Sequence, residues 1–291
     1  MRNEEKRRGA SKMQKGDEIV MKSEFKSRFG GRGRRGGIGW EAELKAASAA
    51  PTNSFTKTLW RFRKDFRRVR RENVGYLNEM WHACQNSEDG VTCYSGLERM
   101  LSEGSLQRIS GDADVLAPIL EVLPHLRLAV PGKLDCNVSG GRWGAHSCFV
   151  VRKDESAAPL SVALDGSVDS AWERILLHIA ESQFYLGWHA GYEEFCIVTD
   201  VRRFAQEANI SFAGEEAWEK IGKAGRARML KNDFAPEVAI ANGVASVSYY
   251  IFSAFGGLFH VVDEVDMKTG NVLPEHVKFD NVVEYDCGVC Y

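Results

Sequence analysis

Two segments of the chain repeat apolar residues at the spacing of an amphipathic helix. In residues 56–84, Leu59, Phe62, Phe66 and Val69 begin a stripe that continues to Cys84, which predicts one long helix with a single apolar face. Asn53 or Ser54 could cap its start. Residues 170–186 repeat the pattern, so we predict a second helix there.

The spacing of apolar residues changes near the C-terminal end of the chain. Residues 238–262 contain no Asp, Glu, Lys or Arg, and this uncharged run is long enough to span a membrane. However, the run is rich in serine, tyrosine and valine, and tyrosine and valine favour strands. Gly256-Gly257 divides it as a two-residue hairpin turn would. We therefore predict buried strands at 244–255 and 258–267, and a third strand at 277–285, and we regard a membrane span as the weaker alternative.

The remaining segments complete an α+β fold class, with a helical N-terminal part, a mixed or antiparallel sheet and a C-terminal β-meander. Further strands are predicted at 133–138, 147–153, 160–164 and 195–199, and further helices at 94–103, 113–123, 201–208 and 215–230. The predicted organisation is a disordered basic tail at 1–50, a helical segment at 52–126 and an α+β domain at 127–291. Alternatively, residues 52–291 form one domain.

Charge is divided unevenly along the chain. Residues 1–80 carry 21 Lys and Arg against 10 Asp and Glu, a net +11, whereas the rest carries a net −13. The Gly- and Arg-rich segment 28–37 cannot build an apolar core, so a disordered tail is expected there. A polyanion could bind this region through its basic residues, which are Arg32, Arg34, Arg35, Arg61, Arg63, Lys64, Arg67, Arg68, Arg70 and Arg71.

The sequence does not decide which partner this basic region binds. Phe62, Phe66 and Trp60 alternate with the arginines, so the helix could contact phosphates and stack on nucleic-acid bases. An acidic protein or an anionic membrane surface would suit the same charges. The basic tail could equally fold back onto the acidic body of its own chain.

The sharpest catalytic hypothesis comes from the C-terminal hairpin. If Gly256 and Gly257 form the loop, Ser253 lies opposite His260, with Tyr249 opposite Glu264, all on one face of the sheet. Serine beside histidine is the start of a nucleophile and base pair. Ser253, His260 and Glu264 are therefore candidate catalytic residues of a hydrolase or transferase.

Two further motifs are weaker. The glycine-rich segment 139–146 predicts a hairpin loop that could hold an anion with Arg142 and His146. Cys287 and Cys290 have the spacing of half a zinc site or of a redox pair, but no second such pair is present in the sequence. We predict no metal and no cofactor.

The sequence leaves three functional hypotheses. The first is a non-catalytic binding or interaction protein, because no catalytic motif is found. The second is the enzyme described above, and the third is a nucleic-acid-associated protein that uses the basic N-terminal arm. Seven cysteines in mainly apolar surroundings and the lack of an apolar leader predict free thiols and a cytoplasmic location, without a transmembrane span.

Overall fold

In the computed structural model, the chain divides into two units, Met1–Ala46 and Ala47–Tyr291. The structure describes residues 53–85, 114, 116–141, 144–154, 156–184, 186–187, 195–201, 204, 221–253 and 256–283, all in the second unit. The predicted tail, the predicted helix at 94–103 and most of that at 201–208 lie outside these residues.

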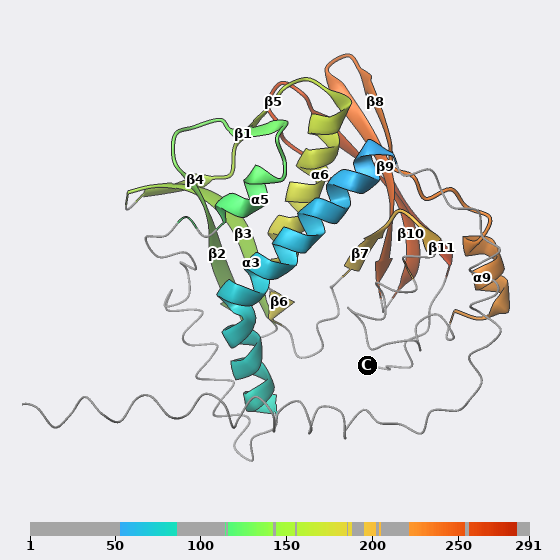
Figure 1. The fold of residues 1–291 in the computed structure, drawn as a ribbon, viewed down its shortest axis with the longest axis horizontal. Helices are drawn as coiled ribbons and strands as arrows, with labels where there is room; N and C mark the ends of the chain where they lie inside the picture. Colours follow the sequence, from blue (N-terminus) through green and yellow to red (C-terminus); the bar gives the residue numbers. More distant parts are fainter. Residues whose placement is uncertain are drawn as a thin grey trace, which may run out of the picture. The chain divides into compact units, whose positions relative to one another are not determined.

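Helix α6 (Val168–Gln183) lies at the centre of the second unit (Figure 1). Ser167 caps it, because its hydroxyl accepts a hydrogen bond from the Ser170 backbone N–H at 3.1 Å. The helix contacts strands of all three sheets, and its residues Trp172, Ile175, Leu176 and Leu177 are fully buried. The second predicted helix is therefore confirmed, although it ends at Gln183 rather than at residue 186.

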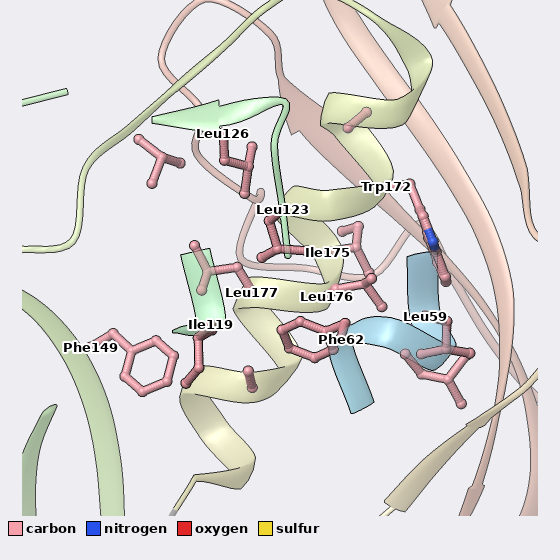
Figure 2. Packing of buried hydrophobic residues seen from close by; sticks show 14 of the residues in the cluster. Leu59, Phe62, Ile119, Leu123, Leu126, Phe149, Trp172, Ile175, Leu176 and Leu177 are labelled. Atoms are coloured by element: carbon pink, nitrogen blue, oxygen red, sulfur yellow. The ribbon is translucent and has the colours of Figure 1, made fainter. Parts of the chain in front are cut away.

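Helix α3 (Ser54–Gln85) crosses α6, and the two pack together (Figure 1). Asn53 caps it, because its side-chain oxygen accepts a hydrogen bond from the Thr56 N–H at 2.8 Å. Leu59 and Phe62 point from α3 into the core formed with α6 and α5 (Ala117–Glu121), as Figure 2 shows. The apolar stripe predicted from the sequence is thus the face that holds this helix.

The C-terminal sheet has the strand order β11-β10-β9-β7, with β8 also paired to β9. Its strands are β7 (Phe195–Val198), β8 (Glu237–Ala241), β9 (Val244–Ser253), β10 (Gly257–Asp266) and β11 (Lys278–Val283). Each of these strands runs antiparallel to the strand with which it pairs. The predicted meander is confirmed, and the described part of the uncharged run 238–262 consists of strands β8, β9 and β10 with turn residues between them. No helix among the described residues is long and apolar enough to span a membrane.

One face of this sheet packs on α6. Ala245, Val247, Tyr249 and Ile251 alternate along β9 and belong to the core that also contains Trp172. Trp172 contacts Tyr249 edge-on, with ring centroids 6.0 Å apart, and donates a hydrogen bond from Nε1 to the Phe55 carbonyl at 3.0 Å. A single side chain therefore joins α3, α6 and the C-terminal sheet.

Two smaller sheets flank the same core. One contains β2 (Lys133–Gly141), β3 (Gly144–Lys153), β4 (Ser156–Pro159) and β6 (Leu186–Gly187); the other pairs β1 (Leu126–Leu128) with β5 (Val162–Leu164). Helix α9 (Lys223–Met229) contacts β11. The α+β class is confirmed. Strands β1, β4, β6 and β8 were not predicted, and the described part of the predicted helix 215–230 is helical only from Lys223.

Candidate functional site

The solvent-facing side of α3 carries a regular row of basic residues. Lys57, Arg61, Lys64, Arg68 and Arg71 follow one another at intervals of four, three, four and three residues, so they lie on one face of the helix. All are exposed except Arg68, whose side chain is still 41% accessible. We call these five residues the basic stripe. Its length is about 21 Å at 1.5 Å per residue.

Among the residues that the structure describes, Arg68 is the one member of the stripe that pairs with acidic side chains. Arg68 donates hydrogen bonds to Asp65 at 3.1 Å and to Glu72 at 3.4 Å, within the same helix. Exposed pairs of this kind contribute little to stability, so they orient the guanidinium without fixing it strongly. Lys57 is the member of the stripe that we did not single out from the sequence; its position follows from the same three- and four-residue spacing.

The other predicted basic residues of this helix face inward. Arg63 donates a hydrogen bond to the Ile197 carbonyl at 2.6 Å, and Arg70 donates one to the Phe184 carbonyl at 3.1 Å. Arg67 lies between them along the helix, and all three are half-buried. These arginines line a pocket beside the core rather than the exposed stripe.

Two aromatic residues of α3, Phe62 and Phe66, are packing residues. Phe62 is only 5% exposed and stacks on the half-buried Phe66, with centroids 5.7 Å apart. Phe66 in turn contacts Phe184 edge-on at 5.9 Å. The expectation that Phe62 and Phe66 stack on nucleic-acid bases is therefore wrong, because the same rings anchor the helix.

The predicted register of the C-terminal hairpin is also wrong. Gly257 pairs with Ser253, so three residues separate β9 from β10, and Gly257 already belongs to the second strand. His260 consequently lies opposite Tyr250, and Glu264 lies opposite Ser246. Since side chains alternate along a strand, Ser253 and His260 project from opposite faces of the sheet, and the proposed pair does not form.

His260 makes a different set of contacts. Its Nε2 shares a hydrogen bond of 2.7 Å with the Ser248 hydroxyl, and its ring stacks on Tyr250 with centroids 4.7 Å apart. Burial, followed by the nearby Lys278 charge, lowers the pKa of His260. Within the described residues, no carboxylate hydrogen-bonds its other ring nitrogen, so the third member of a catalytic triad is missing.

The remaining sequence candidates divide into two groups. The glycine-rich segment is not an open loop: Ser139 pairs with His146, and the ladder continues to Gly141 and Gly144. His146 is therefore a strand residue, and the loop predicted at 139–146 is shorter than expected, because both strands continue to Gly141 and Gly144. Outside the described residues lie Arg32, Arg34, Arg35, Arg142, Cys287 and Cys290.

The free thiols that the structure describes differ in exposure. Cys136 and Cys196 are buried, as the apolar surroundings predicted, whereas Cys148 is exposed. Among the described residues, no cluster of three His, Cys, Asp or Glu side chains could hold a metal ion.

A buried acid on the core face of β10 was not anticipated. Asp263 is 2% exposed and accepts a hydrogen bond from the Tyr249 hydroxyl at 2.5 Å and another from His276. Burial is the first cause, and the Asp263 charge the second, of a Tyr249 pKa well above its usual range. The sequence signal was present: Asp263 lies between Val261 and Val265 on the buried side of an alternating strand.

A second buried acid lies near the start of α6. Glu173 is 1% exposed and accepts a hydrogen bond from the His125 backbone N–H at 2.8 Å. Burial raises the pKa of Glu173 to about 7. The His125 ring pairs with Asp165 at 2.6 Å, and this hydrogen bond raises the pKa of His125. These contacts join the loop before β1 to the start of α6.

Comparisons with models of protein families, with curated proteins and with solved structures found no match to this chain.

Proposed function

We propose that this protein is a non-catalytic nucleic-acid-binding protein and that the basic stripe of α3 contacts the phosphate backbone. The observation that carries the proposal is the row of five basic side chains on one exposed helix face. Phosphate contacts by Lys and Arg supply most of the affinity of sequence-independent nucleic-acid binding.

The stripe is presented by a firmly held element. On the other side of the helix, Leu59, Phe62 and Val69 are 5% exposed or less and belong to the hydrophobic core. The basic side chains therefore project from a backbone whose position is set before binding, which lowers the entropy lost on association. A row about 21 Å long can reach several consecutive phosphates of a duplex.

The proposed binding mode does not depend on the base sequence of the nucleic acid. Because Phe62 and Phe66 pack in the core, these two rings do not stack on bases, and the stripe itself offers charge and hydrogen-bond donors. The net charge of +11 over residues 1–80, including the Gly- and Arg-rich segment 28–37, adds long-range attraction to a polyanion. We propose backbone contact without base readout.

The test compares two variants with the same loss of charge. In the stripe variant, Arg61, Lys64 and Arg71 are each replaced by Gln; in the control variant, the exposed residues Arg127, Lys153 and Lys231 are replaced instead. Fluorescence anisotropy with a labelled 20-base-pair duplex of mixed sequence measures Kd at low salt. We expect a loss of at least about tenfold in the stripe variant and less than about threefold in the control.

Equal losses in the two variants would mean that net charge, rather than the stripe, governs binding, and would contradict the proposal. Poly-glutamate of matched charge is the competitor that separates nucleic acid from an acidic protein. If it displaces the duplex at the same charge concentration, the stripe binds acidic chains in general, and the nucleic-acid assignment fails.

A further inference from the structure

Strand β11 forms one edge of the C-terminal sheet. In the strand order β11-β10-β9-β7 it has β10 on one side, and no other described strand pairs with it (Figure 1). Residues 278–281 are exposed along this edge. The edge of a sheet presents backbone N–H and C=O groups that another extended strand can pair with.

Only the first part of β11 is open to such a strand. Val283, at the other end, is 2% exposed, and a Cβ on Gly225 of α9 would lie 2.9 Å from its side chain, so α9 covers that end. Before the strand, the Val277 backbone N–H donates a hydrogen bond to the Val262 carbonyl of β10 at 2.8 Å, so the pairing with β10 already begins there. We call residues 277–281 the free edge.

Two large apolar side chains of the free edge are exposed. Val277 is 59% exposed and Phe279 is 48% exposed, the highest values among the large apolar residues that the structure describes. Phe279 lies opposite Val261, so it projects from the core-facing side of the sheet, and its ring stacks on Phe259 with centroids 4.7 Å apart. A second strand on this edge would remove apolar surface from water.

The other side of the free edge carries two opposite charges. Lys278 and Asp280 lie opposite Val262 and His260 of β10, and the Lys278 Nζ is 3.2 Å from the Asp280 Oδ2. Charged side chains on an edge strand disfavour pairing with strands that do not match them. A matching partner must place an acid opposite Lys278 and a base opposite Asp280.

A second copy of the same edge meets this requirement in one antiparallel register. When a two-fold axis perpendicular to the sheet relates two identical strands, one residue lies opposite its own copy. If that residue is Phe279, Lys278 lies opposite Asp280 of the second copy, and the reverse pair forms as well. Moving the axis by one residue places Lys278 opposite Lys278 or Asp280 opposite Asp280, so like charges oppose the neighbouring registers.

We propose that the free edge is a homodimer interface, in which the β11 strands of two copies pair antiparallel about Phe279. The two C-terminal sheets then continue into each other, with an aromatic pair on one face and two ion pairs on the other. Five residues from each copy form a small interface, so we expect a weak dimer with a Kd of roughly 10–100 µM. The interface does not involve α3 and does not depend on nucleic-acid binding.

Sedimentation velocity with the full chain measures the oligomeric state. The wild type should be monomeric at about 1 µM and mainly dimeric at about 500 µM, because association follows mass action. A protein that stays monomeric over this whole range would overturn the proposal.

A pair of charge reversals tests the register. Asp280→Lys places lysines opposite lysines across the axis, and Lys278→Asp places acids opposite acids, so each variant alone should dimerise at least about tenfold more weakly than the wild type. In an equimolar mixture the two variants restore both opposite-charge pairs, and they should form a heterodimer with a Kd within about threefold of the wild-type value. A monomeric mixture, or a single variant that dimerises as the wild type does, would overturn the register.

The two reversals act at exposed positions, where the side chains of Lys278 and Asp280 are 43% and 63% accessible, so the fold should be kept. Circular dichroism of each variant checks this. Lys153→Asp reverses an exposed charge elsewhere and is the matched control, which should leave the Kd of the dimer within about twofold. An equal loss of dimer in the control would mean that net charge governs association and would contradict the interface.

Amide hydrogen exchange locates the interface in the wild type. Backbone amides within the free edge should exchange more slowly at about 500 µM than at about 5 µM, because the second copy accepts hydrogen bonds from them. Slowing that is confined to other segments would place the interface elsewhere and overturn the proposal. The duplex assay uses variants of α3, so its failure leaves these expectations unchanged, and the two proposals fail separately.

Discussion

Replacing Phe62 by Ala should destabilise the protein by about 4 kcal/mol. The side chain is 5% exposed, stacks on Phe66 and belongs to the same core cluster as Leu176 and Ile119 (Figure 2). A buried phenylalanine removes roughly 150–200 Å² of surface from water, worth about 25 cal/mol per Å², which gives about 4–5 kcal/mol. Measured Phe→Ala losses in protein cores, about 3–5 kcal/mol, agree with this value.

Equilibrium unfolding in urea, followed by circular dichroism, measures the change in the free energy of unfolding. Phe62→Leu refills most of the volume and should cost less than about 1.5 kcal/mol. Phe279→Ala is a control on a ring that is 48% exposed, and it should cost about 1 kcal/mol or less. A loss below about 1 kcal/mol for Phe62→Ala would refute the packing of α3 on α6, and with it the rigid presentation of the basic stripe.

Three further changes test the polar and backbone contacts. Tyr249→Phe should cost about 1.5–3 kcal/mol in urea unfolding, because the buried Asp263 loses a hydrogen bond; a change under 0.5 kcal/mol, on the order of experimental error, would contradict that contact. Gly270→Ala should lower the melting temperature much more than Gly243→Ala. Both glycines have positive φ, but a Cβ on Gly270 would meet a backbone carbonyl oxygen at 2.3 Å, whereas the space at Gly243 is open. Equal decreases in melting temperature for the two variants would refute the close contact at Gly270. Glu173→Gln should flatten the pH dependence of stability between about pH 4.5 and 7, measured by urea unfolding at several pH values. In this pH range Glu173 keeps its proton in the native state and loses it in the unfolded state, so its contribution to the free energy of unfolding falls as pH rises, by at most about 3 kcal/mol. If the free energy of unfolding of the variant changed with pH as steeply as that of the wild type, the raised pKa would be contradicted.

The helices were predictable because their signals are local. The spacing of Leu59, Phe62, Phe66 and Val69 identified α3 and its buried face, and Asn53 marked its start. The same spacing applied to charge identifies the basic stripe, including Lys57, without any tertiary information. In both cases the period of the helix determines which side chains share a face.

The strand register was not predictable from one glycine pair. Gly256-Gly257 suggested a two-residue turn, but only Gly257 has a positive φ, and it is already paired with Ser253. The stronger hairpin signal was Asn242-Gly243, where both residues have positive φ, as a tight turn between β8 and β9 requires. An odd error in register exchanges the two faces of a strand, which explains why the Ser253–His260 pair failed.

No local sequence pattern predicts the pocket beside α3. Arg63, Arg67 and Arg70 look like the exposed arginines of the same helix in the sequence, and only the packing of α6 and β7 distinguishes them. Asp263 and Tyr249 form a comparable case, because their contact depends on the pairing of β9 with β10. Sites made by long-range contacts require the fold.

The salt dependence of duplex binding tests the central proposal most directly. If the five cations of the stripe each neutralise a phosphate, the logarithm of the association constant should fall with the logarithm of salt concentration with a slope of about −4.5 or steeper. The Arg61, Lys64 and Arg71 triple variant should reduce that slope by roughly 2–3, and the Arg127, Lys153 and Lys231 control should leave it unchanged. A wild-type slope near zero, or one that the stripe variant does not alter, would contradict phosphate binding by α3.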